Sequence, residues 1–341
     1  MAGIRHVITD GRVPASPGFS FWKEKRVGSN DTLVFSGSGS RRLANAICNQ
    51  LGVAVAKGET LKFSDGNLFV RVLENVRGRR AFIVQGTCFP TNDNFIELLF
   101  WIDALKRASA REVTAIIPFY SYAKGDKKDE PRVSIRGRVC ADALEAAGVD
   151  RIVTMDLHAA QVQGFFSVPV DHLYALPIIC NYVKSLNLPN LVVASPDEGF
   201  VRMARKYALA LDTPMAVGDK YRPSHNERAE IRAILGNVEA ATVLIVDDFA
   251  LSCGSLVAMT QALLENGARE VYAAVSHGLL SQGSTEKIEQ SPIKQLIITD
   301  SVENQPAPIT PKIKVVSVAG LFAEVIRRIS SYQSVSALFP L

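Results

Sequence analysis

The feature that most constrains the fold is a repeated order of short apolar segments and longer segments with helical spacing. The order begins with a predicted strand at 32–36 and a predicted helix at 41–51. Strands that alternate with helices over short connections form parallel sheets with helices on both faces. The order restarts near residue 177, so the sequence predicts an α/β protein with two similar domains.

The predicted elements follow each other in two runs along the chain. Predicted strands cover residues 32–36, 81–85, 113–118, 152–155, 191–194, 215–217, 243–246 and 271–275. Predicted helices cover residues 41–51, 93–109, 139–147, 177–186, 199–211 and 256–266. We expect an N-terminal arm at 1–30, one domain at 31–176 and a second at 177–341, with a hinge near 174–178.

Composition indicates a soluble globular protein of the cytoplasm. Hydrophobic residues make up 48% and charged residues 21% of the 341 residues, and no apolar run approaches the roughly 18 residues of a membrane span. The net charge of +4 favours anionic small molecules in a cleft over nucleic acid or a membrane. Five widely spaced cysteines lack metal-binding spacing and indicate reduced thiols.

The most informative stretch is 243–256, where an apolar strand leads into two adjacent carboxylates, Asp247 and Asp248. Small residues follow them, namely Ser252, Cys253, Gly254 and Ser255. A turn of this kind before a helix presents backbone N–H groups to an anion, whereas the two carboxylates suit hydroxyl groups or a metal. The stretch therefore predicts a site for a sugar phosphate.

Acidic and imidazole groups also follow other predicted strands. His158 comes shortly after the strand at 152–155, Asp197 after 191–194, and His277 after 271–275. One Asp after a strand is usually a helix cap, but several such groups at the edge where loops converge indicate Mg²⁺ and phosphate chemistry. For His277 we also expect a structural role.

Two loops carry clustered charge, one at 120–132 and one at 219–226. Most charged loops are solvated surface. In the second loop, however, Lys220 and Arg222 alternate around Tyr221, so both cations would point the same way in an extended segment. Such a loop could close over a polyphosphate and neutralise its charge.

Several segments, considered together, resemble one known family from Phe35 to Phe339. The most specific are Phe35-Ser-Gly-Ser38, Lys62-Phe-Ser-Asp-Gly66, Val76-Arg-Gly78, Asn92-Asp-Asn94, Asp103-Ala-Leu-Lys-Arg-Ala-Ser109, Thr154-Met-Asp-Leu-His-Ala-Ala-Gln161, Gln163-Gly-Phe-Phe166, Ser195-Pro-Asp197 and Ser334-Val-Ser336. They are similar to segments of the ribose-phosphate diphosphokinases, or phosphoribosyl pyrophosphate synthetases. The resemblance implies two phosphoribosyltransferase-like domains, each a mostly parallel sheet flanked by helices.

The resemblance also implies an activity. The family transfers the β,γ-diphosphoryl group of Mg-ATP to the 1-hydroxyl of ribose 5-phosphate, which yields phosphoribosyl pyrophosphate and AMP for nucleotide biosynthesis. Its members form homo-oligomers built from dimers, so we expect a homo-oligomer here, with a paralogue as a further candidate partner.

The family's site residues match positions of this chain one by one. As implied by the resemblance, the catalytic residues are Lys220, Arg222 and His158; the ribose 5-phosphate residues are Asp247, Asp248, Ser252, Cys253, Gly254, Ser255 and Asp197; the ATP residues are Phe63, Asp65, Asn67, Lys124, Asp129 and Asp171; the Mg²⁺ ligands are His158 and Asp197; and the residues similar to a phosphate or ADP regulatory site are Arg77, Arg132, Ser334 and Ser336.

Several positions depart from the family pattern. Leu251 stands where the family has a third acid after the Asp pair, and Phe200 stands where it has a glycine. Asn67 replaces a glutamate, and Lys124 with Gly125 replaces an Arg-Gln pair. Lysine keeps the charge of arginine but loses its planar fork, so adenine and phosphate recognition would change.

Three hypotheses therefore stay open at this point. The first is an active diphosphokinase on ribose 5-phosphate, which the retained cations and strand-end acids favour. The second is a weakly catalytic or non-catalytic regulatory subunit of an active paralogue. The third is the same chemistry on a different phosphorylated sugar, because Leu251 and Phe200 both lie near the predicted sugar-phosphate site.

Overall fold

A computed structural model describes residues 31–221, 230–303 and 305–338. Five parallel strands form the first sheet in the order β1–β4–β5–β6–β7. They are β1 (Thr32–Ser36), β4 (Arg80–Val84), β5 (Glu112–Ile117), β6 (Arg151–Met155) and β7 (Val170–Leu173). Residues of all five strands are mostly buried and apolar, as expected of a parallel sheet covered on both faces.

The second sheet has seven strands in the order β10–β9–β8–β11–β12–β13–β14, and within it only β9 and β10 pair antiparallel. They are β8 (Leu191–Ser195), β9 (Met215–Tyr221), β10 (Glu230–Leu235), β11 (Thr242–Ala250), β12 (Glu270–Gly278), β13 (Leu296–Thr299) and β14 (Ile313–Val316). A separate antiparallel hairpin joins β2 (Gly58–Lys62) to β3 (Leu68–Val72).

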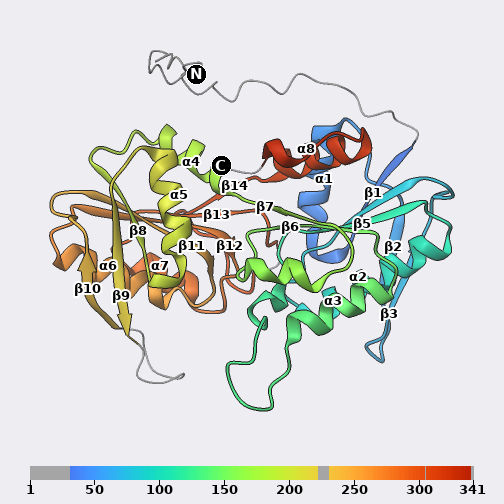
Figure 1. Cartoon of the computed structure of the whole chain (residues 1–341), viewed down its shortest axis with the longest axis horizontal. Helices are drawn as coiled ribbons and strands as arrows, with labels where there is room; N and C mark the ends of the chain where they lie inside the picture. Colours follow the sequence, from blue (N-terminus) through green and yellow to red (C-terminus); the bar gives the residue numbers. More distant parts are fainter. Residues whose placement is uncertain (1–30, 222–229, 304, 339–341) are drawn as a thin grey trace, which may run out of the picture.

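Helices cover the sheets (Figure 1). They are α1 (Arg41–Leu51), α2 (Thr91–Arg107), α3 (Arg136–Ala146), α4 (Leu176–Ser185), α5 (Val201–Leu211), α6 (Gly254–Glu265), α7 (Ser284–Gln290) and α8 (Ala319–Ser330). Short 3₁₀ turns are η1 (Ser38–Ser40), η2 (Ser121–Lys124), η3 (Ala160–Phe165), η4 (Glu198–Phe200) and η5 (Ser336–Leu338). The predicted α/β class, with mostly parallel sheets flanked by helices, is confirmed.

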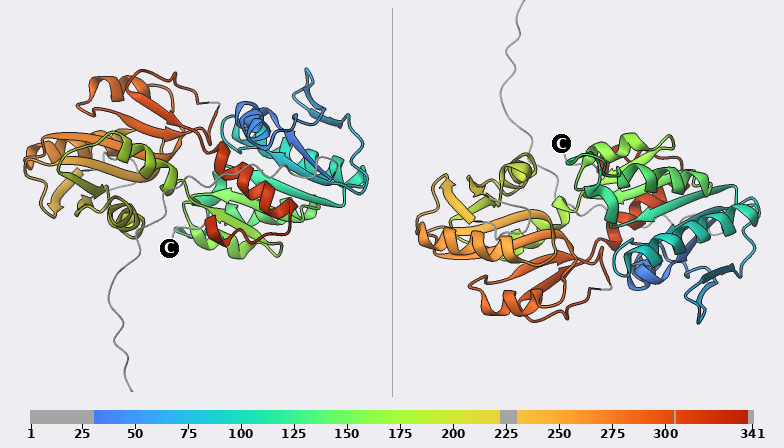
Figure 2. Two further views of the ribbon diagram at one scale, coloured as in Figure 1. Left: turned by 90° about the horizontal axis from the view of Figure 1, so that it is seen from above. Right: turned by 90° about the horizontal axis from the view of Figure 1, so that it is seen from below.

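The two sheets lie side by side along the long axis of the molecule, as the views from above and below show (Figure 2). Between them runs one apolar core, to which β1, β4 and β6 contribute from the first sheet and β8, β11 and β12 from the second. This shared core brings the loops of both sheets to a common rim. Within the described parts of the chain, no helix is long and apolar enough to cross a membrane.

The last helix returns to the start of the chain. α8, red in Figure 1, packs beside α1, blue. Arg327 at its end donates from Nη2 to the Gln50 carbonyl at 3.2 Å, and Thr32 Oγ1 donates to Ser330 Oγ at 3.1 Å. Part of the predicted second domain thus covers the first sheet, and the domain boundaries stay a prediction.

Two strands extend further than the sequence predicts. β11 continues to Ala250, so Asp247 and Asp248 lie inside the strand and not after it. β12 explains this difference, because it pairs with β11 as far as Ala250 opposite Gly278. β9 continues to Tyr221, since β10 pairs beside it.

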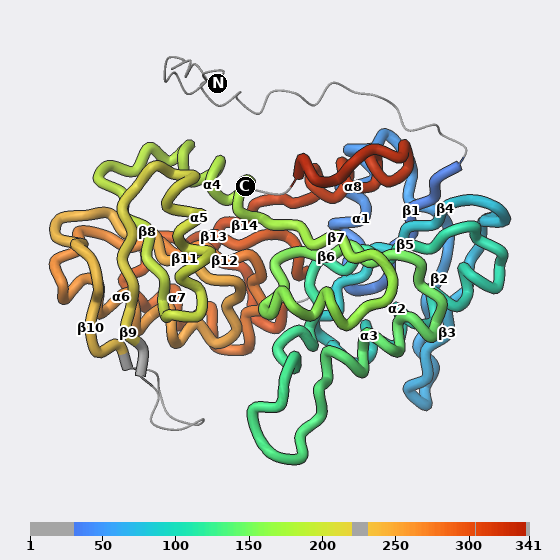
Figure 3. The backbone as a smooth tube through the Cα atoms, in the orientation of Figure 1, coloured from blue at the N-terminus to red at the C-terminus, as the bar shows by residue number. Residues whose placement is uncertain are grey.

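Other elements were not predicted. The hairpin strands β2 and β3, strands β7, β10, β13 and β14, and helix α7 are only four to seven residues long. Helix α8 has twelve residues and buries Phe322, Val325 and Ile326 at helical spacing, so its sequence did carry a signal. The tube in Figure 3 also shows the segment between η2 and α3 projecting from the body of the molecule. That segment is the first charged loop singled out in the sequence.

Candidate active site at the carboxyl ends of both sheets

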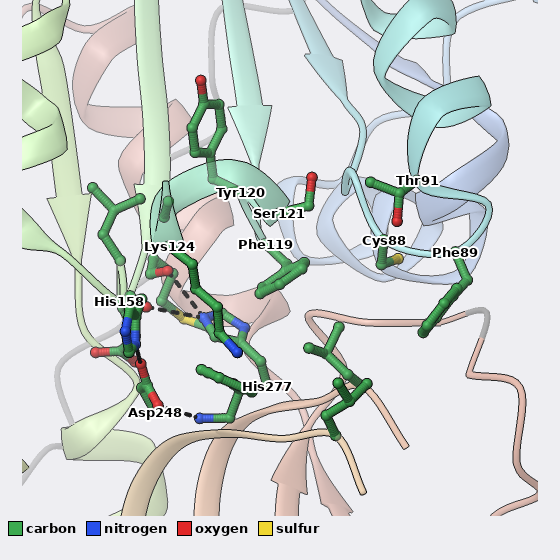
Figure 4. Close-up of a pocket in the computed structure, with 17 residues that line it drawn as sticks. Cys88, Phe89, Thr91, Phe119, Tyr120, Ser121, Lys124, His158, Asp248 and His277 are labelled. Atoms are coloured by element: carbon green, nitrogen blue, oxygen red, sulfur yellow. Dashed lines mark hydrogen bonds and ion pairs between the residues drawn. The ribbon is translucent and has the colours of Figure 1, made fainter. Parts of the chain in front are cut away.

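A cavity of about 200 Å³ opens where strands of both sheets end (Figure 4). Its lining comes from the segments after β4, β5 and β6 and from the ends of β11 and β12. The lining residues are Cys88, Phe89, Thr91, Phe119, Tyr120, Ser121, Ala123, Lys124, Met155, Asp156, Leu157, His158, Asp248, Phe249, Leu251, His277 and Leu279. Carboxyl ends of parallel strands are where open α/β sheets place their ligands.

One wall of the cavity is apolar and aromatic. Phe119 lies against the His277 ring, with centroids 4.9 Å apart, and Phe89 faces the same space (Figure 4). The Nζ of Lys124 stands 3.7 Å from the centroid of the Phe249 ring. This is a cation–π contact, which holds the ammonium group at the edge of the cavity.

The polar wall centres on a contact between the two sheets. His158, in the segment after β6, places Nδ1 2.5 Å from Oδ2 of Asp248 on β11. The His158 side chain is 48% exposed, whereas the Asp248 side chain is 11% exposed. Residues 90 positions apart in sequence therefore meet in one hydrogen-bonded pair at the rim.

Asp247 is under electrostatic strain. Its burial, followed by the negative charges of Asp248 and Asp197, raises the pKa of this carboxyl well above its ordinary value. The N–H of Asp248 donates to Asp247 Oδ1 at 2.9 Å and opposes the shift. A carboxyl whose pKa is raised by neighbouring carboxylates is typical of sites that receive a cation or accept hydrogen bonds from hydroxyl groups.

The predicted phosphate turn is present after β11. Cys253 adopts a left-handed conformation with φ of 59°, and α6 begins at Gly254. The first N–H groups of a helix have no partner within the helix and can bind an anion. Ser252 and Gly254 are exposed and Ser255 is partly exposed, whereas the Cys253 side chain is buried. Burial raises the pKa of the Cys253 thiol to about 11, so this residue packs and offers only its backbone.

Asp197 and Phe200, the residue that differs from the family pattern, lie in the segment that follows β8. The Asp197 side chain accepts from the Gly199 N–H at 3.1 Å and begins the 3₁₀ turn η4. Phe200 packs its ring against the shared core. The ring that replaces a family glycine thus turns inward and does not fill the sugar-phosphate site.

The predicted ATP residues are scattered in the single chain. Phe63 and Asp65 lie in the β2–β3 turn, where Phe63 is 51% exposed and its ring centroid lies 6.1 Å from that of Phe69. Asp65 accepts from the Asn67 side-chain amide at 2.7 Å. Neither the hairpin nor Asp129, exposed in the loop before α3, contributes to the cavity formed by the described residues.

Asp171 and Lys124 differ in where they lie. Asp171 on β7 forms a 2.8 Å ion pair with Arg151, at the opposite end of the strands from the cavity. Lys124 lines the cavity itself. Packing favours glycine at the neighbouring position 125, because a Cβ on Gly125 would stand 2.8 Å from Nε of Arg136.

The predicted catalytic cations can be placed only in part. The Lys220 backbone belongs to β9 and pairs with Ile231. Arg222 lies outside the described residues.

The four predicted regulatory residues do not come together in one subunit. Ser334 and Ser336 line a second pocket of about 460 Å³ with Arg80, Glu112 and Arg151. The backbone of Arg77 pairs with that of Ala110 in an isolated antiparallel β-bridge, and Arg132 has a φ of 66° in an exposed turn. Neither arginine belongs to the lining that the described residues give this pocket.

A divalent cation fits the donor chemistry of the rim. Among the described residues no three acidic, imidazole or thiol groups form a complete metal cage. Mg²⁺ does not need one, since it is usually bound by one or two protein groups together with substrate phosphates and water. Because Nδ1 of His158 faces Asp248, Nε2 is the nitrogen left for a ligand bond, and Asp197 supplies a nearby carboxylate.

Sequence reasoning missed the aromatic wall. Phe89, Phe119 and Leu279 line the cavity, yet each reads in sequence as an ordinary core residue. A signal was present, because Phe119 comes two residues after the end of β5 and Leu279 directly after β12. Apolar residues at strand ends deserve the same scrutiny as acidic ones in a parallel sheet.

Comparisons with known proteins agree with this architecture. The family model for the N-terminal domain of ribose phosphate pyrophosphokinase matches residues 32–148, and the phosphoribosyl synthetase-associated domain matches residues 202–340. The crystal structure of phosphoribosylpyrophosphate synthetase from Mycobacterium smegmatis is similar, with a TM-score of 0.82 and 36% identity. The match covers 89% of this chain and 99% of that one.

Curated relatives are more similar in sequence. Ribose-phosphate pyrophosphokinases from Caldanaerobacter subterraneus and Porphyromonas gingivalis are each 46% identical over 312 residues, which is 91% of this chain and 98% of theirs. One from Rhizobium meliloti is 45% identical over 308 residues, or 90% of this chain and 99% of the relative. Fold and site define a phosphoryl-transferring α/β enzyme. The chain belongs to the ribose-phosphate pyrophosphokinase family.

Proposed function

We propose that this chain transfers the β,γ-diphosphoryl group of Mg-ATP to the 1-hydroxyl of ribose 5-phosphate. The observation that carries the proposal is the His158–Asp248 contact, which unites the strand ends of both sheets beside an acidic pair and a helix N-terminus. Relatives at 45–46% identity that bear the name ribose-phosphate pyrophosphokinase support the same reaction. They favour it over a purely regulatory role.

Ribose 5-phosphate would lie along β11 and the start of α6. Asp247 and Asp248 accept hydrogen bonds from the 2- and 3-hydroxyls, and the turn from Ser252 to Ser255 binds the 5-phosphate. Asp248 can serve two partners, because Oδ1 accepts from the Phe249 N–H at 2.8 Å while Oδ2 faces His158. Each carboxylate oxygen keeps a further lone pair for the sugar.

In the transfer step the 1-oxygen of the ribose forms a bond to the β-phosphorus. The bond from that phosphorus to the oxygen shared with the α-phosphate breaks, AMP leaves, and the hydroxyl proton is released. The work of such a site is positioning and charge neutralisation. Lys220 and Arg222 are proposed to supply positive charge, with Lys124 at the rim orienting the nucleotide.

Mg²⁺ is the proposed metal cofactor, and His158 and Asp197 are its proposed protein ligands. When bound, it neutralises the charge on the diphosphoryl oxygens. We also propose that Phe63, Asp65, Asn67, Asp129 and Asp171 contribute to ATP binding and assembly in a homo-oligomer built from dimers. The exposed Phe63 ring on the projecting hairpin supports a pocket shared between subunits.

We propose a cytoplasmic location as well. All five cysteines are free and buried, which suits a reducing compartment.

The reaction is tested by incubating the purified protein with Mg-ATP and ribose 5-phosphate and resolving the nucleotides. We expect AMP and phosphoribosyl pyrophosphate in equal amounts, and no product when EDTA exceeds Mg²⁺. ADP in place of AMP would overturn the diphosphoryl reading. Turnover only with another sugar phosphate would move the assignment to a different acceptor.

A further inference from the structure

The segment that carries His158, residues 155–158, is held by two buried histidines from opposite sides. His277 on β12 places Nε2 3.1 Å from the Met155 carbonyl oxygen and 3.2 Å from that of Asp156. His172 on β7 places Nε2 2.9 Å from the Leu157 backbone nitrogen. Both imidazoles are at least 98% buried. His277 also lines the cavity, but both of its ring nitrogens already have protein partners.

The hydrogen-bond chemistry fixes which ring nitrogen carries the proton. Two carbonyl oxygens accept from Nε2 of His277, so this nitrogen must bear a hydrogen, and Nδ1 is left to accept from Ser301 Oγ at 2.8 Å. At His172 the reverse holds, because the Leu157 N–H donates to Nε2. One histidine therefore donates to the segment and the other accepts from it.

A third group holds the same segment. Asp156 has a φ of 40°, in the left-handed region that costs energy for a residue with a Cβ. Its Oδ2 accepts from Ser276 Oγ at 2.6 Å and from the Ala175 N–H at 2.8 Å. These bonds offset the strained backbone and tie β6 of the first sheet to β12 of the second.

These contacts form a closed loop of interactions that includes the His158–Asp248 pair. His277 lies directly opposite Phe249 in the β11–β12 ladder, and Phe249 adjoins Asp248. From Asp248 the loop of interactions passes to His158 and back through the 155–158 segment to His277. A shift of His277 relative to the 155–158 segment must therefore change the distance between His158 and Asp248.

We propose that His172 and His277 are positioning residues that fix the 155–158 segment from two sides and so hold His158 against Asp248. Neither touches the substrates; each acts through His158. The inference rests on the proposed function, in which His158 works beside the transferred group. It explains why two buried histidines flank the segment that carries the His158 side chain into the cavity.

The sharpest test exchanges His277 for two amides that differ only in reach. His277→Gln can place an N–H where Nε2 stands, whereas His277→Asn reaches only the Nδ1 position and cannot donate to the two carbonyls. We expect kcat to fall about 100-fold in His277→Asn, as for a displacement near 1 Å, and by no more than about threefold in His277→Gln. At His172 the same pair should behave alike, with the glutamine oxygen accepting from Leu157.

A double-variant cycle separates positioning from general stability. If His277 acts through His158, His158→Ala with His277→Asn should lose no more kcat than His158→Ala alone, within about twofold. Independent, additive losses would overturn the proposal, as would wild-type kcat in His277→Asn. His277→Asn should also melt at a lower temperature than His277→Gln, because it leaves the two carbonyl oxygens without a donor, so kcat is compared where both variants are folded.

A measurement without turnover keeps the test independent of the activity. In NMR spectra the imidazole signals of His158 should move in His277→Asn toward those in Asp248→Asn, and should stay near wild type in His277→Gln. If the wild-type protein makes neither AMP nor phosphoribosyl pyrophosphate, the proposed function fails and this readout still decides the positioning. If His277→Asn does not fold, Ser276→Ala removes one bond to Asp156 and should shift the same signals; unchanged signals would overturn the proposal.

Discussion

The carboxyl ends of both sheets and the amino ends of the first sheet carry pockets of opposite character. At the carboxyl ends, Asp248 lines the cavity beside His158. The adjacent acid Asp247 has a pKa that is raised by desolvation and by neighbouring negative charges. At the amino ends, the pocket beside Arg80 contains paired charges: Arg80 Nε lies 3.2 Å from Glu112. One end holds like charges together, and the other balances opposite charges.

The difference separates the candidate active site from contacts that stabilise the fold. Arg80 is only 4% exposed, donates to the Ser330 carbonyl at 2.7 Å and stacks 4.2 Å from the Tyr332 ring centroid. It thereby fastens the segment after α8 to the first sheet. Repelling carboxylates cost stability and remain useful only if a ligand relieves them. Variants at the two ends should therefore respond in opposite ways.

The largest effect is expected at Asp247. Asp247→Asn removes a carboxylate that grips the sugar, so kcat/KM for ribose 5-phosphate should fall about 1,000-fold. Because the folded-state pKa is raised, ionisation at neutral pH opposes folding, and the variant should melt at a higher temperature. Enzyme assays and calorimetry check both changes. A variant that loses activity and stability together would contradict the account of repelling charges.

At the opposite end, Arg80→Ala should leave Glu112 without its partner and detach the segment after α8. We expect a loss of about 3 kcal/mol in the free energy of unfolding, with kcat close to wild type. Arg80→Lys keeps the charge but not the planar stacking, so it should lose less. Urea unfolding gives these values, and an unchanged stability in Arg80→Ala would show that the contacts contribute nothing.

The carboxyl ends should also respond to acid, through the buried His277. Burial lowers the pKa of His277 to about 4 from 6.5, so its stabilising contribution is complete above pH 6.5 and is lost as the pH falls toward 4. His277→Gln should therefore lose about 2 kcal/mol less stability than wild type over this range. Burial raises the pKa of Asp156 to about 6 and acts in the opposite sense, but equally in both proteins. Parallel pH curves would contradict the assignment.

The smallest effect is expected at Leu251, which is 39% exposed at the mouth of the cavity. Leu251→Asp restores the acid that the family pattern has at this position. We expect less than about 1 kcal/mol change in stability because the side chain is half exposed, and a several-fold change in KM for ribose 5-phosphate. Leu251→Asn is the neutral control of equal size. Equal KM values in the two variants would mean that charge at this position is irrelevant.

The sequence was sufficient for the α/β class and for the strands with strong apolar runs. It also located the acid pair, since Asp247 and Asp248 directly follow the apolar run that forms the first part of β11. It was less informative where partners decide the structure. β11 reaches Ala250 only because β12 runs beside it, and a neighbouring strand far along the chain is invisible in local periodicity.

The same reasoning explains what was missed in the site. His277 carries no sign in sequence that its ring reaches Met155 and Asp156 in the other sheet. Asp171, which the resemblance places at the ATP site, pairs with Arg151 in the folded chain, and its role at that site stays a proposal. Contacts between elements that are far apart in sequence follow from tertiary packing, which residue type and spacing alone do not encode.

The comparison of the two sheet ends is tested most directly by calorimetric titration of ribose 5-phosphate in the presence of Mg²⁺. The proteins are wild type, the double variant Asp247→Asn with Asp248→Asn, and Arg80→Ala as the matched control from the opposite end. We predict that Arg80→Ala binds with wild-type affinity within about threefold, whereas the double variant loses at least about 100-fold, or 2.7 kcal/mol. Retained binding in the double variant, with loss in Arg80→Ala, would contradict the placement of the sugar at the carboxyl ends.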